Sequence, residues 1–107
     1  MGIGNAVVID AEAERLIERY TLRDLLERIE QILFAQRATP ERVARIVLSP
    51  DRAWSQSRPR LLMTVEFDAD SHQAYDAWKR VCPLVEPISS HAEDEESLIF
   101  DFAGRDG

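Results

Sequence analysis

The most regular hydrophobic pattern in the chain lies in residues 21–37. Apolar residues recur there at spacings of three and four, and they fill a sector of roughly 120° when the segment is drawn as a helix. The pattern predicts an amphipathic helix, and Thr21 followed by Asp24 predicts a capping box at its start. The expected buried stripe consists of Leu22, Leu25, Leu26, Ile29, Ile32 and Leu33.

The residues before Thr21 have a helical pattern that faces another way. In residues 11–20 the apolar positions centre about 170° from the later stripe if the helix is continuous. Two interpretations remain open. Either the helix breaks at Thr21 and the first segment covers a different surface, or one long helix buries two opposite faces and needs a partner. In both cases, residues 11–20 cover something beyond a minimal core.

Alternation of apolar and polar residues predicts the strands. It is clearest in residues 60–68, where Leu61, Met63, Val65 and Phe67 share one face. In residues 42–48, Ala44, Ile46 and Leu48 are expected on one face, with Val43, Arg45 and Val47 on the other. Shorter candidates are residues 6–9, 97–102 and 84–88, the last an edge strand because it contains Pro87.

A second helix is expected to begin after Asp70, with Gln73 completing a capping box, and to end at Pro83. The order of elements is therefore (β)αββαββ. This order predicts an α+β two-layer sandwich, ferredoxin-like or rearranged ferredoxin-like, with helices packed on one face of a mostly antiparallel sheet. The crossover that leaves the strand at residues 60–68 should be right-handed.

Length and composition indicate one folded domain. The chain has 107 residues, of which 45% are hydrophobic and 31% charged, so a single domain spanning residues 1–107 is expected, with residues 1–5 and 104–107 mobile. Cys82 is the only cysteine, which excludes an internal disulfide. No apolar run reaches the length of a membrane span, so we expect no membrane association and a cytoplasmic location.

The net charge of −7 is unevenly distributed. Residues 1–60 contain nine acidic and ten basic residues, whereas residues 61–104 contain ten acidic residues and only Lys79 and Arg80 as cations. Most of the surface would therefore repel a phosphate backbone. This argues against general nucleic-acid binding.

The connection between the two central strands combines aromatic and cationic residues. Such residues are over-represented at protein-binding hot spots, so the predicted protein-binding set is Arg52, Trp54, Arg58 and Arg60. The competing interpretation is that Trp54 folds back over the end of the sheet and the arginines only solvate the loop.

A second candidate site lies on the face of the sheet that the helices leave open. Arg45 and Glu66 would project there among apolar neighbours and line a possible pocket. Val43, Val47, Leu62 and Thr64 would complete its lining. The alternative is a cross-strand ion pair on a solvated face.

The remaining chemistry-bearing residues have simpler explanations. Asp68, Asp70 and His72 contain oxygen and nitrogen ligands, but Asp70 is already explained as a helix cap. His91 lies in an acidic loop, and Cys82 is interpreted as a small buried hydrophobe. The four glycines all lie near the termini, so no phosphate-binding loop is present. We therefore expect no catalytic residue, no metal and no cofactor.

These features favour a small acidic protein-interaction or regulatory module without catalytic activity. Its partner would be a second copy, joined through residues 11–20 or through sheet edges, or a larger protein of which it is an inhibitor or subunit. The alternative is a small enzyme or small-ligand-binding domain that uses the open face of the sheet.

Overall fold

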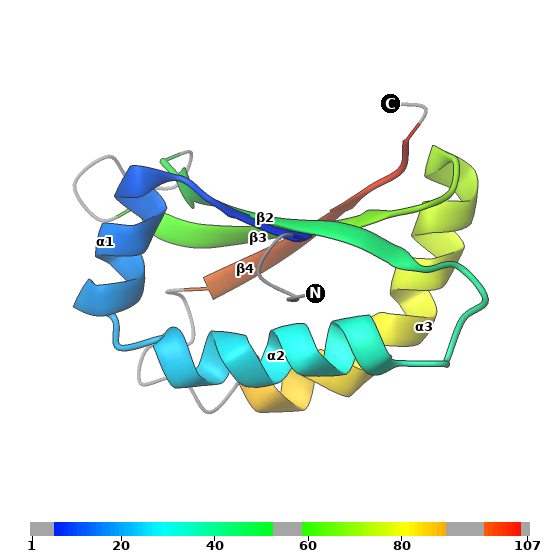
Figure 1. Ribbon diagram of the computed structural model, residues 1–107, viewed down its shortest axis with the longest axis horizontal. Coiled ribbons are helices and arrows are strands. Elements are labelled where there is room, and N and C mark those ends of the chain that lie inside the picture. Colours follow the sequence, from blue (N-terminus) through cyan, green and yellow to red (C-terminus); the bar gives the residue numbers. More distant parts are fainter. Residues whose placement is uncertain (1–5, 53–58, 90–97, 106–107) are drawn as a thin grey trace.

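One four-stranded sheet with three helices packed against it forms the fold (Figure 1). It is seen in a computed structural model that describes residues 6–52, 59–89 and 98–105. Among these residues no helix combines the length and apolarity needed to cross a bilayer. The elements are β1 (Val7–Ile9), α1 (Ala11–Arg19), α2 (Arg23–Ala35), β2 (Val43–Asp51), β3 (Arg60–Phe67), α3 (Ser71–Ser89) and β4 (Leu98–Ala103).

The sheet is mixed, with the strand order β1-β2-β3-β4. The outer pairs β1–β2 and β3–β4 are parallel, and the central pair β2–β3 is antiparallel. The α+β class is therefore confirmed, whereas the prediction of a mostly antiparallel sheet is wrong. The ferredoxin-like topology is not confirmed, because each parallel pair consists of hydrogen-bonded neighbours instead of strands split by a third one.

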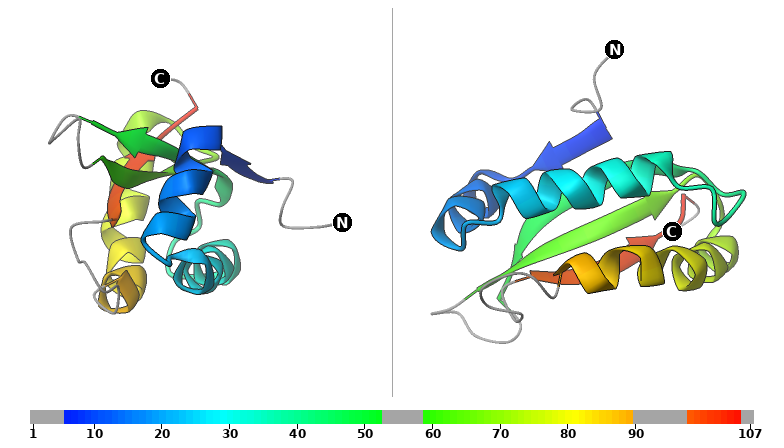
Figure 2. Two further views of the ribbon diagram at one scale, coloured as in Figure 1. Left: turned by 90° about the vertical axis from the view of Figure 1, so that its left-hand side faces the viewer. Right: turned by 90° about the horizontal axis from the view of Figure 1, so that it is seen from below.

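The two crossover connections have opposite hands. Both run below the same face of the sheet, while β1 and β2 point opposite to β3 and β4 (Figure 1). Seen from the helix side with β3 pointing up, β4 lies to the right of β3, so that crossover is right-handed as predicted (Figure 2, right). By the same test β2 lies to the left of β1. This connection, which runs through α1 and α2, is therefore left-handed and departs from the general preference for right-handed crossovers.

The hydrophobic core lies between α2 and the two central strands. Leu22, Leu26, Ile29 and Leu33 are each at most 3% exposed, so the predicted stripe faces the sheet. Leu25 and Ile32 lie at its half-buried margin. The strand side of the core alternates as expected, and its fully buried members are Ile46, Leu48, Leu61, Met63, Val65 and Phe67.

The helix breaks at Thr21, which resolves the two interpretations of residues 11–37. Thr21 has φ of 55°, the Leu22 N–H donates to the Ile17 carbonyl at 2.9 Å, and the Thr21 N–H donates to the Glu18 carbonyl at 3.3 Å. These two bonds form a Schellman motif that ends α1. The predicted capping box of Thr21 is wrong, since Leu22 is the N-cap of α2 and makes no side-chain cap bond.

The helix α3 passes through Pro83, which was expected to end it, and through Pro87, which was expected to lie in an edge strand. Its start is as predicted, because the Gln73 N–H donates to Asp70 Oδ1 at 2.8 Å. The helix then continues past Pro83 and Pro87, bending as it turns under the sheet (Figure 1). The predicted strand at residues 84–88 is therefore wrong. The complete burial of Val81 and Val85 on one helical face explains why the segment stays helical.

A β-bulge alters the start of β2. The register with β3 shifts between Val43 and Arg45, so two residues of β2 lie opposite one residue of β3. Val43 consequently packs against the core and Ala44 is exposed, the reverse of the predicted alternation. The strand also extends to Asp51, beyond its predicted end at Leu48.

Gly104 and Arg105 lie against the start of α3. The Arg105 N–H donates to the Ala69 carbonyl at 2.7 Å, and its guanidinium holds Asp68 at 2.8 Å. A Cβ added to Gly104 would lie 2.6 Å from backbone atoms of Asp70 and Ser71. The mobility of residues 104–107 stays a prediction, and residues 1–5, 106 and 107 lie outside the described ranges.

We expect Thr21→Gly to stabilise the fold. A β-branched residue at positive φ is strained by about 1–2 kcal/mol, part of which is offset by the greater freedom of glycine in the unfolded chain. Urea denaturation should show a gain of up to about 1 kcal/mol in the free energy of unfolding. Thr64→Gly is the matched control, and it should lose stability because Thr64 lies in a strand. A loss in the Thr21 variant would contradict the assignment of strain.

Gly104→Ala should destabilise the fold by about 1–3 kcal/mol, since its new methyl group meets backbone atoms that cannot rotate away. The control Arg105→Ala removes only an exposed ion pair and should cost no more than about 1 kcal/mol. Thermal denaturation of both variants tests this. Equal losses in the two variants would show that the close approach of Gly104 is unimportant.

Candidate binding surface: the uncovered face of the sheet

All three helices of the described residues lie on one side of the sheet, and none of them covers the other side (Figures 1 and 2). Alternation along β3 turns Leu61 and Met63 toward the helices and Leu62 and Thr64 away from them. Leu62 and Thr64 are half-buried even though no helix covers them. This uncovered face therefore carries a defined set of side chains from all four strands.

An aliphatic band crosses the uncovered face. Val8 of β1 pairs in register with Val47 of β2, and Leu62 of β3 pairs with Ile99 of β4. Val8 is 44% exposed, and the other three are half-buried. Because residues on one face of adjacent strands lie within contact distance, these four side chains form a diagonal stripe across the sheet.

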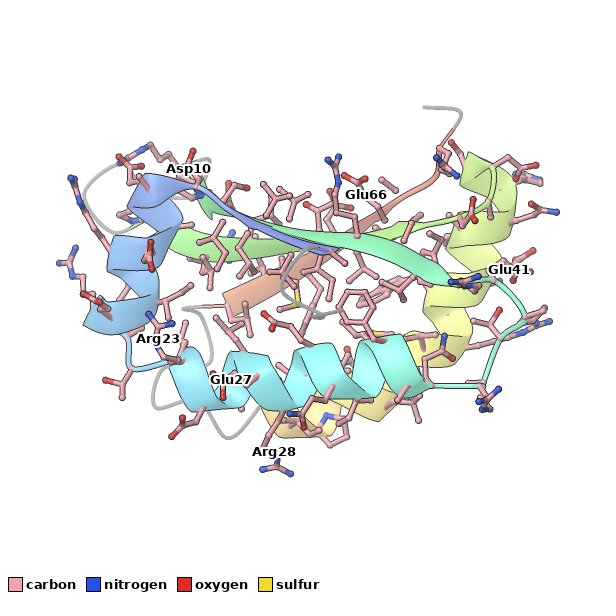
Figure 3. All side chains as sticks on the ribbon, viewed as in Figure 1. Asp10, Arg23, Glu27, Arg28, Glu41 and Glu66 are labelled. Carbon is pink, nitrogen blue, oxygen red and sulfur yellow. The ribbon has the colours of Figure 1, made fainter. Side chains whose placement is uncertain are left out.

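Two ion pairs flank this aliphatic band. Arg45 and Glu66 are cross-strand partners joined by two hydrogen bonds of 3.0 Å, and this interaction raises the pKa of the Arg45 guanidinium. Figure 3 shows Glu66 on the side of the sheet away from α2. At the other end, Arg60 holds Asp51 at 3.2 Å. Both ends of the face are thus locally neutral.

The possible pocket at Arg45 and Glu66 is an open hollow of about 490 Å³ beside Gly104 and Arg105. Each of its two cations already holds a carboxylate, Arg45 that of Glu66 and Arg105 that of Asp68. Val43 does not belong to its lining, because the bulge turns this residue toward the core. The hollow therefore offers no unpaired guanidinium for an anionic ligand.

The predicted protein-binding set is only partly described. Arg52 forms an ion pair with Glu12 of α1, and Arg60 pairs with Asp51. Trp54 and Arg58 lie outside the described residues. The Arg60 ion pair thus links β3 to β2 at the end of the hairpin, and the Arg52 ion pair links the same end to α1.

The apolar face of α1 is used inside the chain. Ala13, Leu16 and Ile17 are at most 4% exposed, and the Tyr20 hydroxyl donates to the Pro59 carbonyl at 2.8 Å. The helix covers the ends of β2 and β3, which agrees with the prediction that residues 11–20 cover something beyond the minimal core. The apolar face of α1 is therefore buried within the chain and does not lie on its surface.

The remaining candidates have structural partners. Asp68 is bound to Arg105, and Asp70 caps α3. Within residues 6–52, 59–89 and 98–105, no group of three or more His, Cys, Asp or Glu side chains is placed to hold a metal. Burial and the nearby Glu86 raise the pKa of the Cys82 thiol, which disfavours the reactive thiolate.

Sequence reasoning missed two members of the aliphatic band, Val8 and Ile99. Both belong to edge strands that pair in parallel with their neighbours. Their alternation is visible in the sequence, but which of the two faces they occupy depends on register. For Ile99 a signal was available, because it alternates with Leu98 and Phe100, which the sequence pattern places inward; the β-branched run around Val8 gave no indication of its face.

The chain matches no family model, and no curated protein or solved structure matches it either.

Proposed function

We propose that the protein is a non-catalytic protein-interaction module that buries the uncovered face of its sheet against a second copy of itself. The observation that carries the proposal is the aliphatic band formed by Val8, Val47, Leu62 and Ile99. On a sheet with one face in water, the residues that point to that face are usually polar. Their aliphatic character supports a covered face.

The topology supports the same conclusion. Parallel strands occur mostly in sheets that are covered on both faces. Here both outer pairs are parallel, and the helices cover only one face. A second layer supplied by a partner would give these strands the environment in which such pairs are usually found.

The charges favour a second copy as the partner. The chain has a net charge of −7, so two copies repel each other over most of their surfaces. On the uncovered face, however, Arg45 neutralises Glu66 and Arg60 neutralises Asp51, and the one further charge that β2, β3 and β4 place there is the exposed carboxylate of Asp101, in register with Thr64. Two such faces can meet with their aliphatic bands in contact, and a twofold axis makes the contact self-complementary.

The size of the face sets the expected strength. Four strands spaced about 4.8 Å apart and about six residues long give a footprint of about 400 Å² per copy. Two copies would therefore share about 800 Å² in total, which is below the roughly 1,000 Å² of a stable specific interface and in the range of weak, transient ones. We therefore expect a weak dimer with a dissociation constant in the micromolar range.

Sedimentation equilibrium tests the proposal with two variants of the face. Leu62→Glu buries a carboxylate in the interface, and Thr64→Arg adds a bulky cation at its centre, so each should weaken the dimer more than tenfold. Leu84→Glu is the control, because Leu84 is a 41% exposed leucine on α3 and should leave the dimer intact. Circular dichroism should show that all three variants are folded.

A wild-type protein that stays monomeric at about 1 mM contradicts the proposal, since even a weak dimer of about −4 kcal/mol would form there. A dimer that survives both substitutions on the face also contradicts it.

A further inference from the structure

A small apolar hollow lies between β1 and α2. Its floor consists of apolar side chains from the sheet and both amino-terminal helices, and its volume is about 170 Å³. Cavities of about 150 Å³ hold a benzene-sized group, so this hollow can accept one leucine or phenylalanine side chain. The lining residues are Val7, Ile9, Ile17, Leu26 and Leu48, with Arg23, Glu27 and Glu30 of α2 alongside.

The strand next to the hollow has a free backbone edge. Among the strands of residues 6–52, 59–89 and 98–105, β1 is the last on its side of the sheet and has β2 as its one neighbour. The Asp10 N–H donates to the Leu48 carbonyl at 3.1 Å, so it points toward β2. Because backbone groups alternate along a strand, the N–H and C=O of Ile9 point the other way, to the edge. An extended segment could pair there.

Two carboxylates beside the hollow have no cation of their own. Neither Glu27 nor Glu30 forms an ion pair among the described residues, and Arg23 lies 3.9 Å from Glu14 instead. Burial and the charge of Glu27 together raise the pKa of Glu30. The side chains of Arg23 and Glu27 lie on the same side of α2 as β1 (Figure 3). A positive charge brought to this place would relieve the repulsion between the two carboxylates.

We propose that this groove binds an extended segment of a different protein, which adds a strand to the free edge of β1. The segment places one apolar side chain in the hollow and a lysine or arginine beside Glu27 and Glu30. In a strand, residues two positions apart lie about 6.8 Å apart on one face. The recognised pattern is therefore an apolar residue with a basic residue two positions away, and backbone pairing supplies the remaining contacts.

A second copy of the chain does not fit this groove. Its two edge strands, β1 and β4, contain no lysine or arginine. Pairing two β1 strands about a twofold axis would also bring Glu27 and Glu30 of both copies together. The groove is separate from the uncovered face, so it stays accessible in the proposed dimer, and the two proposals are independent.

A synthetic peptide provides the probe. It is capped at both ends and about seven residues long, with a central leucine, a lysine two positions away on each side, and threonine elsewhere. Titration followed by ¹H–¹⁵N correlation spectra should shift the amide signals of residues 7–10 and 23–30. Glu27→Lys should weaken binding about tenfold, because attraction is replaced by repulsion. Glu18→Lys makes the same charge change on an exposed position of α1 and should leave the affinity within about twofold.

Peptide variants test separately the contact of the lysines with the carboxylates, the contact of the leucine with the hollow, and the backbone pairing with β1. Replacing both lysines by glutamate, the leucine by glycine, or the leucine amide by its N-methyl form should each weaken binding at least about fivefold. Unchanged affinity for all three would overturn the proposal. Amide shifts confined to residues outside 7–10 and 23–30, equal effects of Glu27→Lys and Glu18→Lys, or no binding at about 1 mM peptide would overturn it as well.

Discussion

The packing of α2 on the antiparallel pair β2–β3 is the interaction on which the structure depends. Ile29 at the centre of this helix is fully buried, and so are Ile46 and Val65 on the strands below it. Every other element is placed relative to this layer: α1 covers one end of it, α3 lies beside α2, and β1 and β4 extend the sheet on either side. Removing the side chain of a residue such as Ile29 would cost about 2–5 kcal/mol, a large part of the stability of a domain of this size.

Much of this layer could be read from the sequence because periodicity reports burial directly. The stripe from Leu22 to Leu33 and the alternation from Leu61 to Phe67 both face the core as predicted. The errors lie where local rules were outweighed by packing. Pro83 is compatible with a helix that buries Val81 and Val85, and Thr21 holds a backbone conformation that usually requires glycine or asparagine.

The pairing of strands could not be predicted in the same way. Whether β1 lies parallel to β2 depends on contacts between distant residues, and periodicity contains no information about them. The prediction of the candidate surface was the most incomplete for this reason, because Val8 and Ile99 join the aliphatic band only through the pairing of β1 and β4 with their neighbours. Arg45 and Glu66, in contrast, were placed on the correct face because both belong to the hairpin, where alternation was clear.

The parallel attachment of β1 also affects how the chain folds as it is made. Strand β1 leaves the ribosome well before the synthesis of β2, which is its one neighbour in the part of the sheet that the structure describes. The nascent chain must therefore keep Val7–Ile9 unpaired until the hairpin and its helix have emerged. Because β1 has only three residues, two of them exposed, its release disturbs little of the core, and its amide protons should be among the first of the sheet to exchange with solvent.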